Sequence, residues 1–348
     1  MFPLSRFVHA FLHETETKNA KFVGTVSDEA FNPNARYDLS ETAVLKKEKD
    51  KDFIILNITD PHFSDYDIRT LLAIPAARTI RRLVRQVKPD LITVTGDMVC
   101  GASTRLSVDR FTALMDSFHI PWAPMFGNHD AESNCDRNFL AEHLQQSQYC
   151  LLQKGDPAMG EGNYIVNITE DDRLVESLIL IDTQTNHNIE KQKQWMAWAA
   201  QGAKELSDGQ AQVSVFGHIP FAQYQAAYDE AWDEKSKKWR NEFGASGRAF
   251  ERICCHRNQD GSPIEFGYFD VIKKAENIPF VFCGHEHMNN FSLVYDGVRL
   301  TYTLKVGKGS GYQSGFNGGT VITVGSSGIQ RAEHRYIHGF FTKTESVF

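Results

Sequence analysis

Five apolar segments of this chain each end in side chains that can bind a metal ion, and this repeated pattern constrains the fold more than any other feature. Each segment is an almost continuous apolar run of strand length, as expected for a strand that is buried on both faces. Glycine closes four of the runs, which lets the chain turn sharply and approach a site closely. The segments are FIILNIT (53–59), LITVTG (91–96), PWAPMFG (121–127), QVSVFG (212–217) and PFVFCG (279–284).

Helical patterns lie between several of these strands. Apolar residues recur at three-to-four spacing from Leu72 to Val87 and from Val108 to Phe118, which predicts two amphipathic helices. Strands that alternate with helices indicate an α/β fold. No repeat or low-complexity linker divides the chain, so we expect a single domain at 51–348 after a polar N-terminal extension at 1–50. Further helices are expected at 136–148 and around 195–206, and further strands at 177–182, 298–304 and 320–325.

Composition argues against several classes of protein. The formal net charge is −7 and the lysine and arginine residues are dispersed, which disfavours an obligate nucleic-acid partner. No apolar run approaches the roughly 18 residues of a membrane-spanning helix, so we expect no membrane association. Residues 1–14 carry Arg6 and His9 within an apolar stretch, which predicts a short amphipathic helix and not a signal peptide. Six cysteines without a C-x-x-C pair indicate free thiols and a cytoplasmic location.

The polar residues that follow the five strands are candidates for one metal site. In α/β sheets the carboxyl ends of the strands border the ligand crevice, so we expect these side chains to converge. Seven of them exceed what one ion needs, since a catalytic zinc takes about three protein ligands. Two ions that share one carboxylate would use the whole set, and mixed carboxylate and imidazole ligands suit Mn, Fe or Zn. The predicted metal ligands are Asp60, His62, Asp97, Asn128, His218, His285 and His287.

The order of these blocks resembles the calcineurin-like metallophosphoesterase superfamily. The D-P-H, G-D, G-N-H-D, G-H and G-H-E-H blocks match the motifs of that family over about residues 53–290. The resemblance implies a four-layer α-β-β-α sandwich of two mixed β-sheets flanked by helices, with two divalent or mixed-valence metal ions at one edge. It also implies a division of the ligands: Asp97 bridges the ions, Asp60, His62 and His287 complete the first site, and Asn128, His218 and His285 complete the second.

The resemblance assigns further roles near the GNHD block. His129 would contact the phosphoryl oxygen or protonate the leaving group, and Asp130 would orient the His129 imidazole through a hydrogen bond. Asn128 and His129 would also contact the substrate. Tyr312, in the glycine-rich segment 307–319, is a further candidate substrate contact. A turn between the closing strands is an equally good interpretation of that segment.

Within the superfamily, the pieces GNHD, GHIP, ERICC and FVFCGHEHMNNF look like the purple-acid-phosphatase-related branch of small single-domain phosphatases. The sequence departs from purple acid phosphatases at one position. Those enzymes carry a tyrosine three residues after the bridging aspartate, and here that residue is Cys100. The tyrosinate-bound Fe(III) site and the strongly acidic pH optimum of purple acid phosphatases therefore do not follow from the resemblance.

These observations predict a metal-dependent phosphoester hydrolase. The preferred hypothesis is a phosphomonoesterase in which a metal-held hydroxide attacks the phosphorus of a phosphorylated small molecule or protein. The alternative is a phosphodiesterase acting on nucleotides or other diesters, because the same centre cleaves diesters. A metal-depleted binding scaffold is the alternative from another class. It predicts gaps among the seven ligands, and the sequence has none.

Overall fold

The computed structural model describes residues 20–64, 75–132, 134–184, 187–307, 315–339 and 341–348. The predicted amphipathic helix at residues 1–14 lies outside the described residues. Leu72, at the start of the next predicted helix, and Tyr312 also lie outside them.

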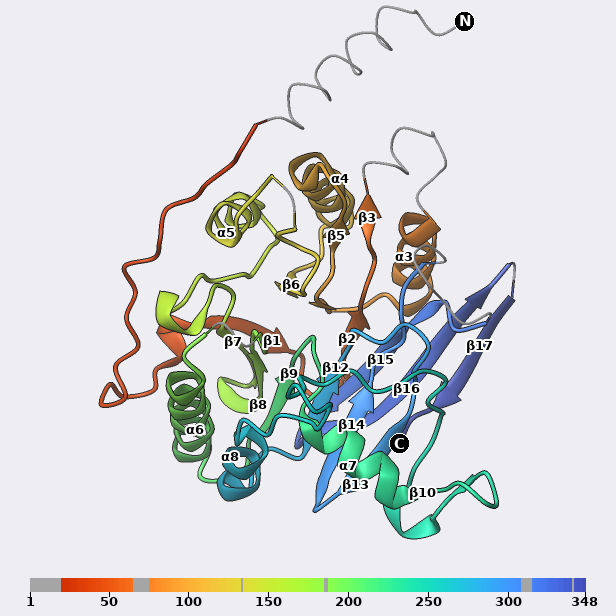
Figure 1. Ribbon diagram of the computed structural model, residues 1–348. Helices are drawn as coiled ribbons and strands as arrows, with labels where there is room; N and C mark the ends of the chain where they lie inside the picture. Colours follow the sequence, from red (N-terminus) through yellow and green to blue (C-terminus); the bar gives the residue numbers. More distant parts are fainter. Residues whose placement is uncertain (1–19, 65–74, 133, 185–186, 308–314, 340) are drawn as a thin grey trace, which may run out of the picture.

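Two mixed β-sheets form the centre of the molecule, and helices cover their outer faces (Figure 1). The helices α3 to α5 lie beside one sheet, and α6 to α8 lie beside the other. The two sheets contact each other where β16 meets β8 and β9. The predicted four-layer α-β-β-α sandwich is therefore confirmed.

The six-stranded sheet has its parallel part at one side and an antiparallel part at the other. β2, β4 and β6 are parallel neighbours, while β15, β16 and β17 continue the sheet in antiparallel pairing. In spatial order its strands are β17 (Phe341–Ser346), β16 (Gly328–His338), β15 (Gly318–Gly325), β2 (Phe53–Ile58), β4 (Leu91–Thr95) and β6 (Trp122–Met125).

The seven-stranded sheet is also mixed. β8, β9, β12 and β14 are parallel neighbours, and the strands at both sides complete the sheet. In spatial order its strands are β1 (Ala43–Lys47), β7 (Tyr164–Glu170), β8 (Arg173–Leu180), β9 (Gln212–Phe216), β12 (Phe280–Cys283), β14 (Val298–Tyr302) and β13 (Ser292–Tyr295).

The helices and short elements connect the strands. Two small two-stranded sheets pair β3 (Phe63–Ser64) with β5 (Val99–Cys100) and β10 (Trp232–Asp233) with β11 (Lys238–Trp239). The helices are α3 (Pro75–Val87), α4 (Thr104–Asp116), α5 (Arg137–Gln145), α6 (Ile189–Leu206), α7 (Ala222–Ala231) and α8 (Tyr268–Ala275), with short 3-10 turns at Leu39–Glu41, Pro157–Met159 and Asn241–Phe243.

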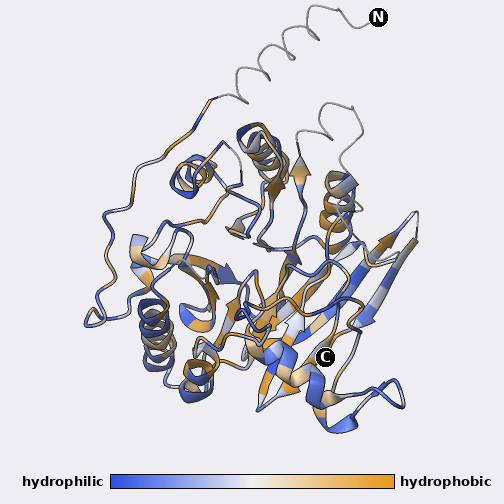
Figure 2. Ribbon diagram, viewed as in Figure 1, coloured by the Kyte–Doolittle hydropathy of each residue, from blue (hydrophilic) through white to orange (hydrophobic). Residues whose placement is uncertain are grey.

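The core follows the predicted apolar pattern. Hydrophobic residues gather on the central strands and on the inward sides of the helices (Figure 2). In α3, Ile80 and Leu83 are fully buried against the six-stranded sheet. Burial of each such side chain contributes about 1.5–3 kcal/mol to folding. This packing anchors the parallel strands whose carboxyl ends carry the predicted metal ligands.

The residues assigned to an N-terminal extension contribute to the domain. β1 pairs in parallel with β7 at the edge of the seven-stranded sheet. The Tyr37 hydroxyl donates a hydrogen bond to Asn167 Oδ1 at 3.0 Å, and Tyr37 is buried. The packed part of the chain therefore includes Tyr37 and β1, which precede residue 50.

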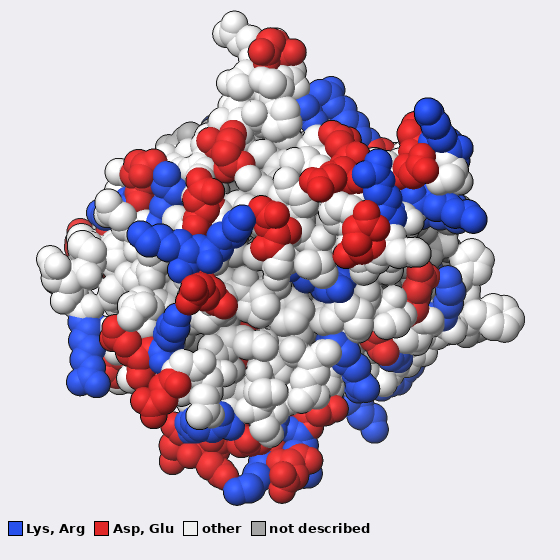
Figure 3. Space-filling model, turned by 90° about the horizontal axis from the view of Figure 1, so that it is seen from below, with Lys and Arg blue, Asp and Glu red and all other residues white. Residues whose placement is uncertain are grey.

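Acidic and basic side chains are interspersed on the face of the molecule seen in Figure 3. Among the described residues, none of the helices combines the length and the hydrophobicity that crossing a bilayer requires. All six cysteines are unpaired, as the sequence predicted.

A buried carboxyl group links the two sheets. Glu176 of β8 is fully buried and accepts hydrogen bonds from Ser214 Oγ at 2.7 Å and from the backbone N–H of Ile329 at 3.1 Å. Burial raises the pKa of Glu176 from 4.5 to about 8, and the two hydrogen bonds only partly oppose this effect. Between pH 4.5 and 8 the folded protein therefore holds a proton that the unfolded chain has released.

We expect Glu176 to make the protein less stable as the pH rises from 5 to 8. The folded state binds the extra proton, so the free energy of unfolding falls by about 1.4 kcal/mol per pH unit from this group. Glu176→Gln keeps the hydrogen-bonding shape and cannot take up the proton. Its free energy of unfolding, measured by urea unfolding at several pH values from 5 to 8, should therefore lack this decrease with pH. Glu205→Gln, at an exposed position of α6, is the matched control. An equal pH dependence in Glu176→Gln and the unmodified protein would contradict a protonated Glu176.

Candidate metal centre

The structure brings the predicted ligands together at the carboxyl ends of the parallel strands. Ligand atoms of Asp60, His62 and His287 lie within 4.8 Å of one another, and those of Asp97, His218 and His285 form a second such group. Asn128 joins the second group, because its Oδ1 lies 3.2 Å from His218 Nε2. All seven predicted ligands thus lie in one cluster drawn from both sheets.

The Asp60 carboxylate is oriented through one oxygen and leaves the other free. Its Oδ2 accepts hydrogen bonds from Thr59 Oγ1 at 2.7 Å and from the backbone N–H of His285 at 3.1 Å. Its Oδ1 lies 3.3 Å from His287 Nε2 and 3.6 Å from His62 Nε2. Among the described residues this buried Oδ1 has no hydrogen-bond partner.

In Asp97, too, one carboxylate oxygen accepts a backbone hydrogen bond and the other faces the predicted ligands. Its Oδ1 accepts the backbone N–H of His129 at 2.8 Å. Its Oδ2 lies 3.5 Å from His62 Nε2 in the first group and 3.3 Å from His218 Nε2 in the second. A single carboxylate oxygen therefore lies between the two groups of ligands.

The second group is oriented by a backbone carbonyl. His218 Nδ1 lies 2.8 Å from the carbonyl oxygen of Thr95, so this nitrogen donates and Nε2 points to Asn128 and Asp97. The imidazole of His285 packs edge-to-face against that of His218, with ring centroids 5.1 Å apart.

Four of these ligands adopt a left-handed backbone conformation that residues other than glycine rarely adopt. The φ angles are 52° at Asp60, 47° at His62, 52° at Asp97 and 77° at His285. Each such residue costs about 1–2 kcal/mol relative to ordinary backbone. Strain of this kind persists where the surrounding structure imposes it, and it clusters at functional sites.

Close packing at the strand ends explains two of the glycines. A Cβ atom at Gly127 would lie 2.1 Å from Asp97 Oδ1, and one at Gly96 would lie 2.4 Å from His218 Nδ1. Gly96 also has a φ of +84°. Any side chain at either position would displace a predicted ligand.

The donor atoms fit metal ions. His62 Nε2 and Asp60 Oδ1 are buried polar atoms without hydrogen-bond partners among the described residues, which is costly unless another group satisfies them. The donors are carboxylate oxygens, an amide oxygen and imidazole nitrogens, a combination that suits Mn, Fe or Zn. Each of the two groups could therefore hold a cation.

The electrostatics of His218 and Asp97 indicate that cation binding is coupled to proton release. Burial opposes the charged form of each side chain, but their mutual attraction outweighs it. The pKa of Asp97 falls to about 2 and that of His218 rises to about 10. A cation that takes His218 Nε2 must displace this proton, so its affinity should increase with pH.

His129 lies at the mouth of the cluster. Its side chain is 36% exposed, and its Nε2 lies 3.9 Å from Asp97 Oδ2. Glu132 Oε1 contacts His129 Nδ1 at 2.5 Å, although the geometry is not that of a hydrogen bond. An imidazole that is partly exposed beside the ligands can contact both a bound substrate and solvent.

Asp130 does not orient His129 through the expected hydrogen bond. Its buried carboxylate accepts backbone N–H groups instead: Oδ2 from Gly127 at 2.7 Å and from Asp97 at 3.0 Å, and Oδ1 from Val99 at 3.0 Å. The reversal of the chain after His129 turns Asp130 inward, where these donors lie. Asp130 thus ties together the loops that follow β4 and β6, and Glu132 is the carboxylate beside the imidazole.

Sequence analysis missed two cationic side chains that position the site. Lys305 is 2% exposed, and its Nζ donates a hydrogen bond to the carbonyl oxygen of Asp60 at 2.7 Å. Arg137 donates to the carbonyl oxygen of Gly127 at 2.7 Å and forms an ion pair with the buried Asp182. A signal existed for both: Lys305 lies between the apolar residues Leu304 and Val306, and Asp182 is the last residue of a predicted strand.

Cys100 stands at the position of the tyrosine ligand of purple acid phosphatases. Burial and the nearby carboxylates raise the pKa of the Cys100 thiol to about 12, which disfavours the thiolate. Its Sγ faces the carbonyl oxygen of His62 at 3.8 Å.

Comparison with known proteins identifies the family. The chain is 25% identical over 325 residues to the Arabidopsis thaliana protein named "Probable inactive purple acid phosphatase 28", covering 80% of this chain and 75% of that one. It is 27% identical over 160 residues to the Saccharomyces cerevisiae phosphatase DCR2, covering 39% of this chain and 27% of that one.

A solved purple acid phosphatase from yellow lupin (Lupinus luteus) seeds superimposes with a TM-score of 0.48 and 11% identity, over 85% of this chain and 54% of that one. The family model for calcineurin-like phosphoesterases matches residues 53–289, a range that contains all seven predicted ligands together with His129 and Asp130. The chain therefore belongs to the calcineurin-like phosphoesterase family and is a metallophosphoesterase.

Proposed function

We propose that this protein is a phosphomonoesterase with a dinuclear metal centre whose two ions share Asp97. The observation that carries the proposal is the position of Asp97 Oδ2, 3.5 Å from His62 Nε2 and 3.3 Å from His218 Nε2. One oxygen between two complete groups of ligands suits a pair of cations. Two such ions would neutralise the charge of a phosphoryl group and lower the pKa of a water molecule.

The residues of this chain supply position and proton transfer. In Asp60 and in Asp97, one carboxylate oxygen accepts hydrogen bonds from backbone or hydroxyl donors. The other oxygen is therefore held in place before any ion binds. His129 at the mouth would donate a proton to the departing alkoxide. Asn128 and His129 would contact the phosphoryl oxygens, as the resemblance implies.

Cys100 stands where purple acid phosphatases carry the tyrosinate that stabilises Fe(III), which supports two divalent ions here. Preference for monoesters is supported by the phosphatase names of the relatives and by the formal net charge of −7, which does not favour a polyanionic nucleic-acid substrate. A phosphorylated small molecule or protein is the expected substrate.

The test is the rate of hydrolysis of an aryl phosphate monoester and of its matching diester. Both rates are measured on the purified protein, after chelation, and after Mn, Fe or Zn is added back. We expect metal-dependent cleavage that is faster with the monoester. Faster cleavage of the diester would reassign the protein as a phosphodiesterase. If neither ester is cleaved at any metal loading, the protein binds metal without hydrolysing esters.

A further inference from the structure

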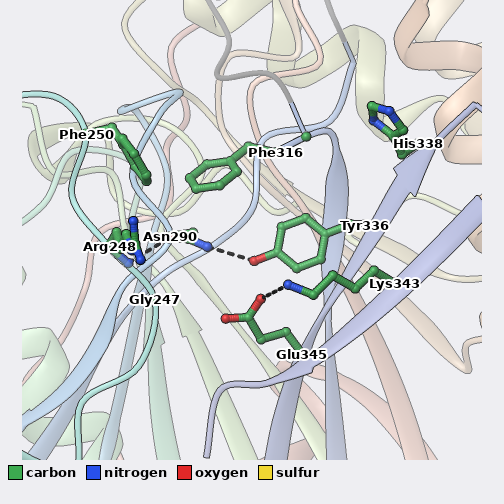
Figure 4. Close-up of a pocket in the computed structure, with 10 residues that line it drawn as sticks. Gly247, Arg248, Phe250, Asn290, Phe316, Tyr336, His338, Lys343 and Glu345 are labelled. Atoms are coloured by element: carbon green, nitrogen blue, oxygen red, sulfur yellow. Dashed lines mark hydrogen bonds and ion pairs between the residues drawn. The ribbon is translucent and has the colours of Figure 1, made fainter.

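A cavity opens next to the segment that follows the predicted ligand His287. Its volume is about 490 Å³, and it opens between the segment 247–250 and the strands β16 and β17 (Figure 4). Cavities of roughly 300–1,000 Å³ with aromatic walls and few polar groups are typical of small-molecule sites. Its lining includes Arg248, Phe250, Asn290, Phe316 and Tyr336.

One wall of the cavity continues directly from the metal-binding segment. Asn290 is three residues after His287, which bounds their Cα separation at about 11 Å. The segment 248–251 runs beside it: Asn290 N–H donates to the carbonyl oxygen of Arg248 at 3.0 Å, and Met288 N–H donates to Glu251 Oε1 at 2.6 Å. The Cα atom of Asn290 in the cavity wall thus lies within about 11 Å of that of the predicted ligand His287, a distance that a group attached to a phosphate at the metal centre would have to span.

Three aromatic rings in contact with one another line one side of the cavity. Phe250 and Phe316 meet edge to face with ring centroids 5.2 Å apart, and Phe316 lies 6.1 Å from Tyr336 (Figure 4). Asn290 Nδ2 donates to the Tyr336 hydroxyl at 2.7 Å, which fixes the tyrosine. Phe250 is 45% exposed, so its ring is accessible to a ligand. Such rings favour a flat aromatic ligand.

The cavity also carries an uncompensated positive charge. Lys343 pairs with Glu345 at 2.8 Å, so its charge is balanced. The Arg248 guanidinium lies over the Phe250 ring at 5.9 Å, and it has no carboxylate partner among the described residues. A free guanidinium on an aromatic wall can bind a carboxylate through two parallel hydrogen bonds.

We propose that this cavity receives the leaving group of the phosphoester and selects a small aromatic group with an acidic substituent. The aromatic walls contact the ring, and Arg248 binds the acidic substituent. The inference rests on the proposed function, and it narrows the substrate class to phosphorylated aromatic acids.

The test compares 3-carboxyphenyl phosphate with its neutral relative 3-carbamoylphenyl phosphate on the metal-loaded protein. We expect a higher kcat/KM for the carboxylate. Arg248→Met should lower kcat/KM for the carboxylate by about tenfold. A fully buried charged contact would contribute more, but Arg248 is exposed. The kcat/KM for the carbamoyl compound should change little. Phe316→Leu should lower kcat/KM for both aromatic esters and leave kcat/KM for glycerol phosphate unchanged. Arg110→Met, at an exposed position of α4, is the matched control.

An unchanged preference for the carboxylate in Arg248→Met would overturn the inference, even if the protein is an active phosphatase. If the unmodified protein cleaves no ester, the proposed function fails, and the cavity is then judged by calorimetric titration of 3-carboxyphenyl phosphate. Weaker binding to Arg248→Met than to the unmodified protein supports the cavity assignment, whereas equal binding refutes it.

Discussion

Replacing Asp97 by asparagine is expected to remove metal from the centre. The kcat/KM should fall by on the order of 10³-fold, because a pair of ions supplies several kcal/mol of transition-state stabilisation. The amide can still accept the His129 backbone N–H through its oxygen, so the loop keeps its main anchor. It then turns an NH₂ group toward His62 and His218, where the carboxylate Oδ2 lies. An amide nitrogen cannot bind a cation in this position.

The metal content of Asp97→Asn, measured by mass spectrometry on protein purified without chelator, is the decisive readout. We expect about one ion or fewer per chain, compared with two in the unmodified protein. Asp172→Asn is the matched control, because the Asp172 side chain is 87% exposed in the turn between β7 and β8. Two bound ions together with full activity in Asp97→Asn would show that Asp97 does not bridge the site.

Replacing His129 by glutamine should lower the rate without removing metal. His129 lies at the mouth of the site, and its Nε2 is 3.9 Å from Asp97 Oδ2. A general acid contributes about 10²–10⁴-fold to the rate. The loss should be large for an alkyl phosphate, whose alkoxide needs a proton, and small for a nitrophenyl phosphate, whose phenolate departs without one. The measurement is kcat for both esters together with the metal content.

Glu132→Gln removes the carboxylate that lies next to the His129 imidazole. Glu132 contacts His129 Nδ1 without a hydrogen bond, so its replacement should keep most of the activity. A fall in metal content in His129→Gln would instead identify His129 as a ligand. An equal loss of rate for both esters would assign it a contact with the phosphoryl group and not a role as proton donor.

The relatives named inactive in Arabidopsis thaliana make these measurements informative for the whole group. This chain brings the complete set of ligands together, with unsatisfied donor atoms at Asp60 and His62. Full metal loading without turnover would show that this protein is inactive, as the names of those relatives say of them. Metal-dependent turnover would show that it is an active enzyme.

Three strands that sequence analysis missed have no continuous apolar run: β1, β7 and β17. β17 has mostly exposed side chains, and the edge strand β1 alternates between exposed and partly buried positions. β7 is buried throughout, yet it includes Asn167 and Glu170, which are satisfied by Tyr37 and Lys47 from distant parts of the chain. A polar residue in a strand becomes compatible with burial only when such a partner is in place, and local sequence does not reveal the partner.

The sequence by itself determined the α/β class, the strands β2, β4, β6, β9 and β12, and the convergence of the seven predicted ligands. It did so because buried strands need apolar runs and because the carboxyl ends of parallel strands share one edge. The tertiary structure alone decided which carboxylate stands beside His129, how Lys305 and Arg137 hold the loops, and where the cavity opens. These features depend on contacts between segments far apart in the chain, and the direction of a side chain in a loop is set by those contacts and not by its neighbours in sequence.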